Sequence, residues 1–204
     1  MKIILLSDPQ LLQGEHEMIR HLFDNELEYF HLRKPDWSIQ EIKKYIDLIP
    51  EKYHNKIIIH DHFELMKEYR LKGVHFNKKN RDHMMKYRDH PIHKSVSTHS
   101  FHEILELQSN PLDYVFLSPI FDSISKEDYK RKFDPCEIKT FFNEKQIVTP
   151  VIALGGVSIN NIDSIKDSGF SGIALLGELW NRYENTRNIK EILSHFNKIK
   201  QKCQ

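Results

Sequence analysis

Cysteine is scarce in this chain of 204 residues: only Cys136 and Cys203 are present, and neither belongs to a Cys-x-x-Cys pair. A structural zinc site or a disulfide framework needs more cysteines at closer spacing, so both are disfavoured and a reducing compartment fits best. Long apolar runs are also absent. The first run stops after Leu6, too early for a signal peptide, and none reaches the length of a membrane span. We therefore expect a cytoplasmic protein with no membrane partner.

An excess of charge of either sign is missing as well. The sequence has 30 lysines and arginines against 29 aspartates and glutamates. Nucleic-acid-binding domains usually carry a basic excess or a recognisable motif, so we expect no nucleic-acid partner. The apolar fraction of 39% is ordinary for a globular protein, and the length predicts one domain over residues 1–204.

Short β-branched runs alternate with longer helical patterns along the whole chain. This alternation is typical of parallel strands joined by crossover helices. Eight units of similar length favour a closed (β/α)8 barrel, the TIM barrel, over an open doubly wound sheet. A helix is predicted after the N-cap Ser38, and another near 189–199 would close the barrel. The predicted strands are 2–6, 29–32, 56–59, 73–76, 94–97, 113–117, 150–154 and 171–176.

Glycine is scarce too, with seven residues, so the positions of the glycines are informative. Gly155 and Gly156 directly follow the seventh predicted strand, and Gly177 follows Leu176 at the end of the eighth. Glycine allows positive φ and a close approach of the backbone to a ligand. Barrels often bind phosphate after strands seven and eight, so we predict that these four residues bind a phosphate. The alternative is that the glycines only turn tight corners.

Polar side chains also follow several of the other predicted strands. The set is cationic, rich in hydroxyl groups and contains an imidazole, which suits an anionic substrate and proton transfer. His99 is the predicted acid/base residue, since imidazole titrates near neutral pH. Lys126, in the long loop over 121–132, is the second catalytic candidate, although a solvated charge is the alternative. The predicted binding residues are Arg33, Lys34, His60, Ser97, Ser123 and Ser125.

Histidine stands at or near four successive strand ends, at His31, His60, His75 and His99. His60 and His62 form a His-x-His pair, a spacing that metal sites use. The pair lies where a strand turns into a helix, so the two rings need not point the same way. We expect His31 and His75 to be packed and hydrogen-bonded, and we disfavour a metal cluster.

Taken together, these motifs resemble the thiamine phosphate synthase/TenI superfamily over nearly the whole chain. The resemblance implies one of two activities. Synthases join hydroxymethylpyrimidine diphosphate to a thiazole phosphate and release diphosphate with Mg²⁺, whereas TenI-type members aromatise a thiazole carboxylate phosphate without a metal. Both bind the thiazole phosphate at the glycine turns. The anchors are His31-Leu32-Arg33-Lys34, Ile59-His60-Asp61, Gly73-Val74-His75, Ser97-Thr98-His99, Asp113-Tyr114-Val115, Ser118-Pro119-Ile120-Phe121, Lys126, Ala153-Leu154-Gly155-Gly156-Val157 and Gly172-Ile173-Ala174.

Departures from the synthase pattern decide the prediction. Where synthases have an Asn-Asp pair after strand three, this chain has His60-Asp61, and no carboxylate follows strand four, where Lys78 and Lys79 stand instead. We therefore predict a TenI-type thiazole tautomerase that needs no cofactor and uses His99 to move the proton. Alternatives are a thiamine phosphate synthase with Mg²⁺ at Asp61, a non-catalytic thiazole-phosphate-binding protein and a sugar-phosphate isomerase. The expected ligand is a thiazole phosphate, and a homo-oligomer is left open.

Overall fold

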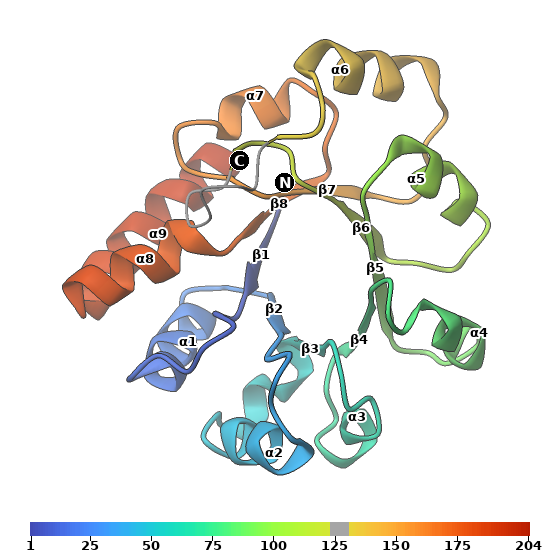
Figure 1. Cartoon of the computed structure of the whole chain (residues 1–204). Coiled ribbons are helices and arrows are strands. Elements are labelled where there is room, and N and C mark those ends of the chain that lie inside the picture. Colours follow the sequence, from blue (N-terminus) through green and yellow to red (C-terminus); the bar gives the residue numbers. More distant parts are fainter. Residues whose placement is uncertain (123–130) are drawn as a thin grey trace.

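The computed structural model describes residues 1–122 and 131–204. Eight parallel strands pair in sequential order and close on themselves, because β1 pairs with β8 as well as with β2 (Figure 1). The predicted (β/α)8 barrel is thus confirmed and the open sheet is excluded. Strand ends differ from the prediction by at most one residue. The strands are β1 (Lys2–Leu6), β2 (Tyr29–Leu32), β3 (Ile57–Ile59), β4 (Gly73–Phe76), β5 (His93–Thr98), β6 (Tyr114–Leu117), β7 (Val151–Leu154) and β8 (Gly172–Leu175).

Helices lie outside the ring of strands (Figure 1). The helix that follows Ser38 begins with a full capping box, in which the Ser38 hydroxyl accepts from the Glu41 amide and the Glu41 carboxylate accepts from the Ser38 amide. The helices are α1 (Glu15–Asp24), α2 (Ile39–Asp47), α3 (Leu65–Glu68), α4 (Met84–Tyr87), α5 (Phe101–Leu107), α6 (Pro135–Glu144), α7 (Ile162–Lys166), α8 (Gly177–Thr186) and α9 (Ile189–Cys203), with 3₁₀ turns η1 (Glu51–Lys56) and η2 (Arg81–His83).

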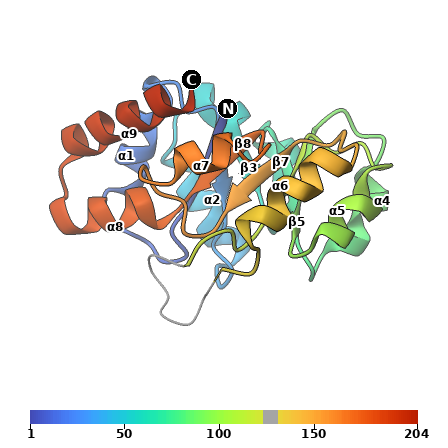
Figure 2. The same cartoon turned by 90° about the horizontal axis from the view of Figure 1, so that it is seen from above.

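The last helix completes the barrel as predicted, and it runs on to Cys203. It lies beside α8 in both views (Figures 1 and 2) and packs against β1 and α1. At its end the terminal ammonium of Met1 donates to the carbonyl of Cys203 at 2.8 Å, so the two chain ends meet. Within the described part of the chain, no helix combines the length and apolar character that a bilayer crossing requires.

Two apolar layers fill the protein, one between the strands and the helices and a smaller one inside the barrel. Side chains alternate along each strand, so every second residue faces the interior of the barrel. That interior is partly polar, because His31, His75 and Ser95 are fully buried among its apolar side chains. The inner apolar residues are Ile4, Leu6, Ile58, Tyr114, Phe116, Ile152 and Ala174.

Candidate active site

A cavity of about 440 Å³ opens at the carboxyl ends of the strands. This size suits a small organic ligand, and the carboxyl face is where TIM barrels carry their active sites. Most of the residues predicted to bind or react with substrate lie on its wall. These are Arg33, His60, Asp61, Ser97, His99, Gly155, Gly156, Leu176 and Gly177.

The glycine turn after β7 needs glycine for two reasons. Gly155 and Gly156 have φ values of 96° and 63°, in the left-handed region that disfavours other residues. A Cβ atom on Gly156 would also lie 2.2 Å from the carbonyl oxygen of Asp122. The turn therefore brings its backbone close to the cavity in a conformation that a side chain would disturb.

In the described part of the chain, amide groups of the two glycine turns have no acceptor and can bind an anion. The side chains of Asn161 and Glu178 accept hydrogen bonds from the next amides of the loop, those of Ser158 and Ile159. Among the described residues, no protein group accepts from the amides of Gly156, Val157 or Gly177. Because Gly177 also begins α8, the helix dipole adds a partial positive charge at this wall.

Replacing Gly156 with alanine is expected to weaken binding of inorganic phosphate about tenfold or more, roughly the value of one hydrogen bond to a charged group. The turn must move away from Asp122, and its amide then no longer points at the anion. Calorimetric titration with phosphate would measure the change. Gly169→Ala is the matched control, because Gly169 also has positive φ but packs against Phe142 rather than the cavity. Unchanged affinity in Gly156→Ala would show that this turn does not bind phosphate.

Positive charge gathers on the opposite side of the mouth, after β2 and β4. Arg33 lies on the cavity wall together with Asn77, Lys78 and Lys79. The last three were not predicted as site residues, although they directly follow the fourth strand and that position was the available signal. Arg33, Lys78 and Lys79 are exposed, so their charges can reach an anionic ligand in the cavity.

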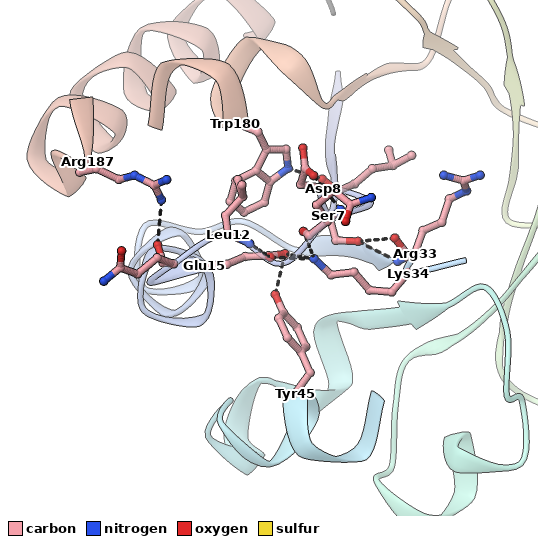
Figure 3. Close-up of polar contacts among 12 residues, drawn as sticks. Ser7, Asp8, Leu12, Glu15, Arg33, Lys34, Tyr45, Trp180 and Arg187 are labelled. Carbon is pink, nitrogen blue, oxygen red and sulfur yellow. Dashed lines mark hydrogen bonds and ion pairs between the residues drawn. The ribbon is translucent and has the colours of Figure 1, made fainter. Parts of the chain in front are cut away.

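Lys34 does not reach the cavity, which corrects its predicted role in substrate binding. Figure 3 shows Arg33 and Lys34 pointing to opposite sides. The Lys34 ammonium lies 2.7 Å from a carboxylate oxygen of Glu15, with both side chains fully buried, and the Tyr45 hydroxyl donates to the same carboxylate at 2.9 Å. Burial raises the pKa of Glu15 and lowers the pKa of Lys34, although each charge opposes the shift of the other. Lys34 is therefore a structural residue.

The hydroxyl of Ser7 fixes the backbone of Arg33. It accepts from the Arg33 amide at 2.8 Å and donates to the Arg33 carbonyl at 2.9 Å (Figure 3). The indole of Trp180 donates to the carbonyl of Leu6 at 2.6 Å, which ties α8 to the same end of β1. The cationic wall and the start of α8 are thus both anchored to the first strand.

His99 stands on the cavity wall with one ring nitrogen already engaged. Its Nδ1 lies 3.1 Å from the carbonyl oxygen of Ser118, which can only accept a hydrogen bond. The Ser118 hydroxyl lies 3.3 Å from the same nitrogen. In the tautomer that donates from Nδ1 to the carbonyl, Nε2 keeps its lone pair, and no described residue bonds to it. Glu103 and Lys132 hold the backbone of His99 through its amide and carbonyl groups. The arrangement can take up a proton from a ligand, as general-base catalysis requires.

Asp61 is the only carboxylate on the cavity wall among the described residues. The predicted role of the other candidates in the long loop stays a prediction, because Ser123, Ser125 and Lys126 lie outside the described residues. His62 does not join His60 in a metal pair, since its Nε2 bonds to the carbonyl of Trp37 at 3.0 Å. The rings of His60 and His62 thus have different partners, as their position at a strand–helix turn allows.

Comparisons with known proteins show the family of this chain. The family model for thiamine monophosphate synthase matches residues 3–179. The chain is 30% identical to the thiamine-phosphate synthase of Dictyoglomus turgidum over 186 residues, which cover 83% of this chain and 78% of that protein. It is 26% identical to the enzyme of Clostridium tetani over 203 residues, covering 96% and 95%. The solved thiamine phosphate pyrophosphorylase from Bacteroides thetaiotaomicron is 35% identical and superposes with a TM-score of 0.81, covering 99% of this chain and 97% of that one. The chain therefore belongs to the thiamine monophosphate synthase family.

Proposed function

We propose that this protein is a thiamine-phosphate synthase, a transferase that joins a pyrimidine diphosphate to a thiazole phosphate. One observation carries the proposal: two sides of the cavity mouth that face each other both carry groups suited to bind an anion. Free amides of the glycine turns line one side, and Arg33, Lys78 and Lys79 line the other. The named relatives support a synthase over the tautomerase that the sequence alone suggested.

Each side would hold one substrate. The glycine turns would bind the phosphate of the thiazole and so place its ring nitrogen within the cavity. In the reaction, the carbon–oxygen bond to diphosphate breaks and diphosphate leaves with the bonding electrons, while the thiazole nitrogen supplies the electron pair of the new carbon–nitrogen bond. Arg33, Lys78 and Lys79 would stabilise the negative charge that develops on the leaving diphosphate.

Asp61 offers a carboxylate for a magnesium ion beside the two lysines. Mg²⁺ is bound in proteins through one or two carboxylates together with substrate phosphates and water. Asp61 lies on the cavity wall beside the cationic side and supplies one such carboxylate. We propose that Asp61 would hold Mg²⁺ when a diphosphate is bound, where the ion would supply positive charge alongside the lysines.

Incubation of the purified chain with both substrates and Mg²⁺ tests the proposal. We expect equal amounts of thiamine phosphate and diphosphate, with neither formed when one substrate is omitted. Asp61→Asn should raise the Mg²⁺ concentration needed for half-maximal rate, whereas Asp89→Asn, on a loop away from the cavity, should not. Absence of thiamine phosphate at saturating substrate and Mg²⁺ would reject the synthase.

A thiazole tautomerase is the second candidate, and the geometry of His99 favours it. A ring with a free Nε2 on the cavity wall suits proton transfer, which joining two substrates does not itself explain. If the chain aromatises thiazole carboxylate phosphate, His99→Ala is expected to slow that reaction about 100-fold, the lower end for acid/base help because His99 is exposed and water can partly replace it. His102→Ala, an exposed histidine of α5, is the matched control. Equal rates for both variants would reject the role of His99.

A further inference from the structure

Three histidines converge inside the barrel, below the floor of the cavity. His31 lies on β2, His75 on β4, and His60 directly follows β3, so three neighbouring strands supply them. Nδ1 of His31 lies 2.8 Å from Nε2 of His60, and the rings of His60 and His75 stack with centroids 4.3 Å apart. One nitrogen from each ring lies within 4.8 Å of the other two. One nitrogen of each ring thus lies close to a nitrogen of the other two.

Two of these rings have a hydroxyl oxygen next to one ring nitrogen. Nε2 of His31 lies 2.5 Å from the Tyr114 hydroxyl, and Nδ1 of His75 lies 2.8 Å from the Ser95 hydroxyl. Each oxygen can accept the N–H of a neutral ring, so the opposite nitrogen keeps its lone pair. That nitrogen lies 2.8 Å from Nε2 of His60 in His31 and 2.8 Å from the Ser97 hydroxyl in His75. Metal-binding histidines have this outer arrangement, in which the second ring nitrogen donates to an oxygen.

The surroundings favour neutral rings. All three histidines are buried, and burial lowers the pKa of His60 to about 3 and those of His31 and His75 well below the usual value. Neutral imidazole is the form that binds a metal ion. The described members of the cluster are all histidines, which suits late first-row ions and not the oxygen-seeking Mg²⁺.

The cluster adjoins the cavity, because His60 belongs both to the cluster and to the cavity wall. Ser97 also lines the cavity, and its hydroxyl lies 2.8 Å from Nε2 of His75. We propose that His31, His60 and His75 form a binding site for a late first-row divalent cation, best suited to Zn²⁺, with the fourth position open toward the cavity. The site is separate from any Mg²⁺ at Asp61 and does not depend on the proposed function.

Titration of the chelator-treated protein with Zn²⁺, in competition with a chromophoric chelator, tests the proposal without an activity assay. We expect one saturable site per chain. Titration with Co²⁺ should give the intense visible absorption of a four-coordinate, nitrogen-bound ion. No saturable binding, or only the weak absorption of six-coordinate Co²⁺, would overturn the site.

Variants then assign the ligands. His60→Asn and His75→Asn should each weaken Zn²⁺ binding at least about 100-fold, since losing even an outer partner of a metal-bound histidine costs about 10–100-fold. His62→Asn is the matched control and should leave affinity unchanged, because its ring bonds to Trp37. If a ligand variant fails to fold, Tyr114→Phe keeps the ligands and should weaken binding about 10–100-fold. Loss of binding in His62→Asn with retention in His60→Asn or His75→Asn would overturn the assignment.

Discussion

Replacing Lys34 with methionine is expected to lower the free energy of unfolding by about 3–5 kcal/mol at neutral pH, the usual cost of removing one partner from a buried ion pair. The carboxylate of Glu15 would stay fully buried, with the Tyr45 hydroxyl and the Leu12 amide as its remaining hydrogen-bond donors. Urea denaturation followed by circular dichroism would measure the change. The effect should be on stability, because Lys34 does not line the cavity.

The loss in Lys34→Met should depend on pH. Burial already raises the pKa of Glu15 above its ordinary value of 4.5, while Lys34 opposes that rise. Without Lys34 the folded-state pKa rises further, so the folded variant binds a proton that the unfolded chain releases. Stability is then highest below the unfolded pKa and falls as pH rises through the folded pKa. We expect the stability of the variant to fall more steeply than that of the wild type as pH rises above the ordinary Glu pKa of 4.5.

Two further variants separate a buried charge from lost packing. The double variant Glu15→Met/Lys34→Met leaves no unpaired charge, so its stability should return to within about 1 kcal/mol of the wild type or exceed it. Lys43→Met breaks the exposed pair with Glu68 and should cost less than about 1 kcal/mol. A loss in Lys34→Met as small as in Lys43→Met would show that the Glu15–Lys34 pair is not energetically buried.

The neighbours Arg33 and Lys34 show what sequence reasoning could and could not reach. The eight strands, the capped helix after Ser38 and the glycine turns all follow from local patterns, and the structure contains them. Consecutive residues at a strand end face opposite sides, so Arg33 and Lys34 could not both face the mouth, and the alternation was available in the sequence. The contact between Glu15 and Lys34 could not be predicted, because Glu15 lies 19 residues earlier in the chain and only the closed barrel brings the two together.

The histidines show a different limit. The expectation that His31 and His75 are packed and hydrogen-bonded is confirmed. The sequence paired His60 with His62, because only residues close in the sequence can be paired when the register between strands is unknown. The structure pairs it with His31 instead, since β2 and β3 align His31 with Ile58 and so place His60 just beyond it. Contacts that depend on the register between strands could not be predicted from one sequence.

Replacing both Lys78 and Lys79 with alanine is expected to lower kcat/KM for the diphosphate substrate about 10²–10⁴-fold, because each ammonium would lose a charge-assisted hydrogen bond to diphosphate worth about 1.5–3 kcal/mol. Inorganic phosphate binding at the glycine turns should change little, since those amides lie on the other side of the mouth. Steady-state kinetics with each substrate varied in turn, together with calorimetry for phosphate, would measure both quantities.

Lys43→Ala/Lys44→Ala is the matched control, because it removes two adjacent lysines from α2 and changes the net charge equally. Long-range attraction of an anionic substrate would respond to both double variants and would fade with added salt. Direct contact with diphosphate predicts that only Lys78→Ala/Lys79→Ala loses activity and that the loss persists at high salt. If both double variants lose activity equally, or if the loss appears in phosphate binding instead, the lysines do not bind the diphosphate and the two-sided arrangement of the site is wrong.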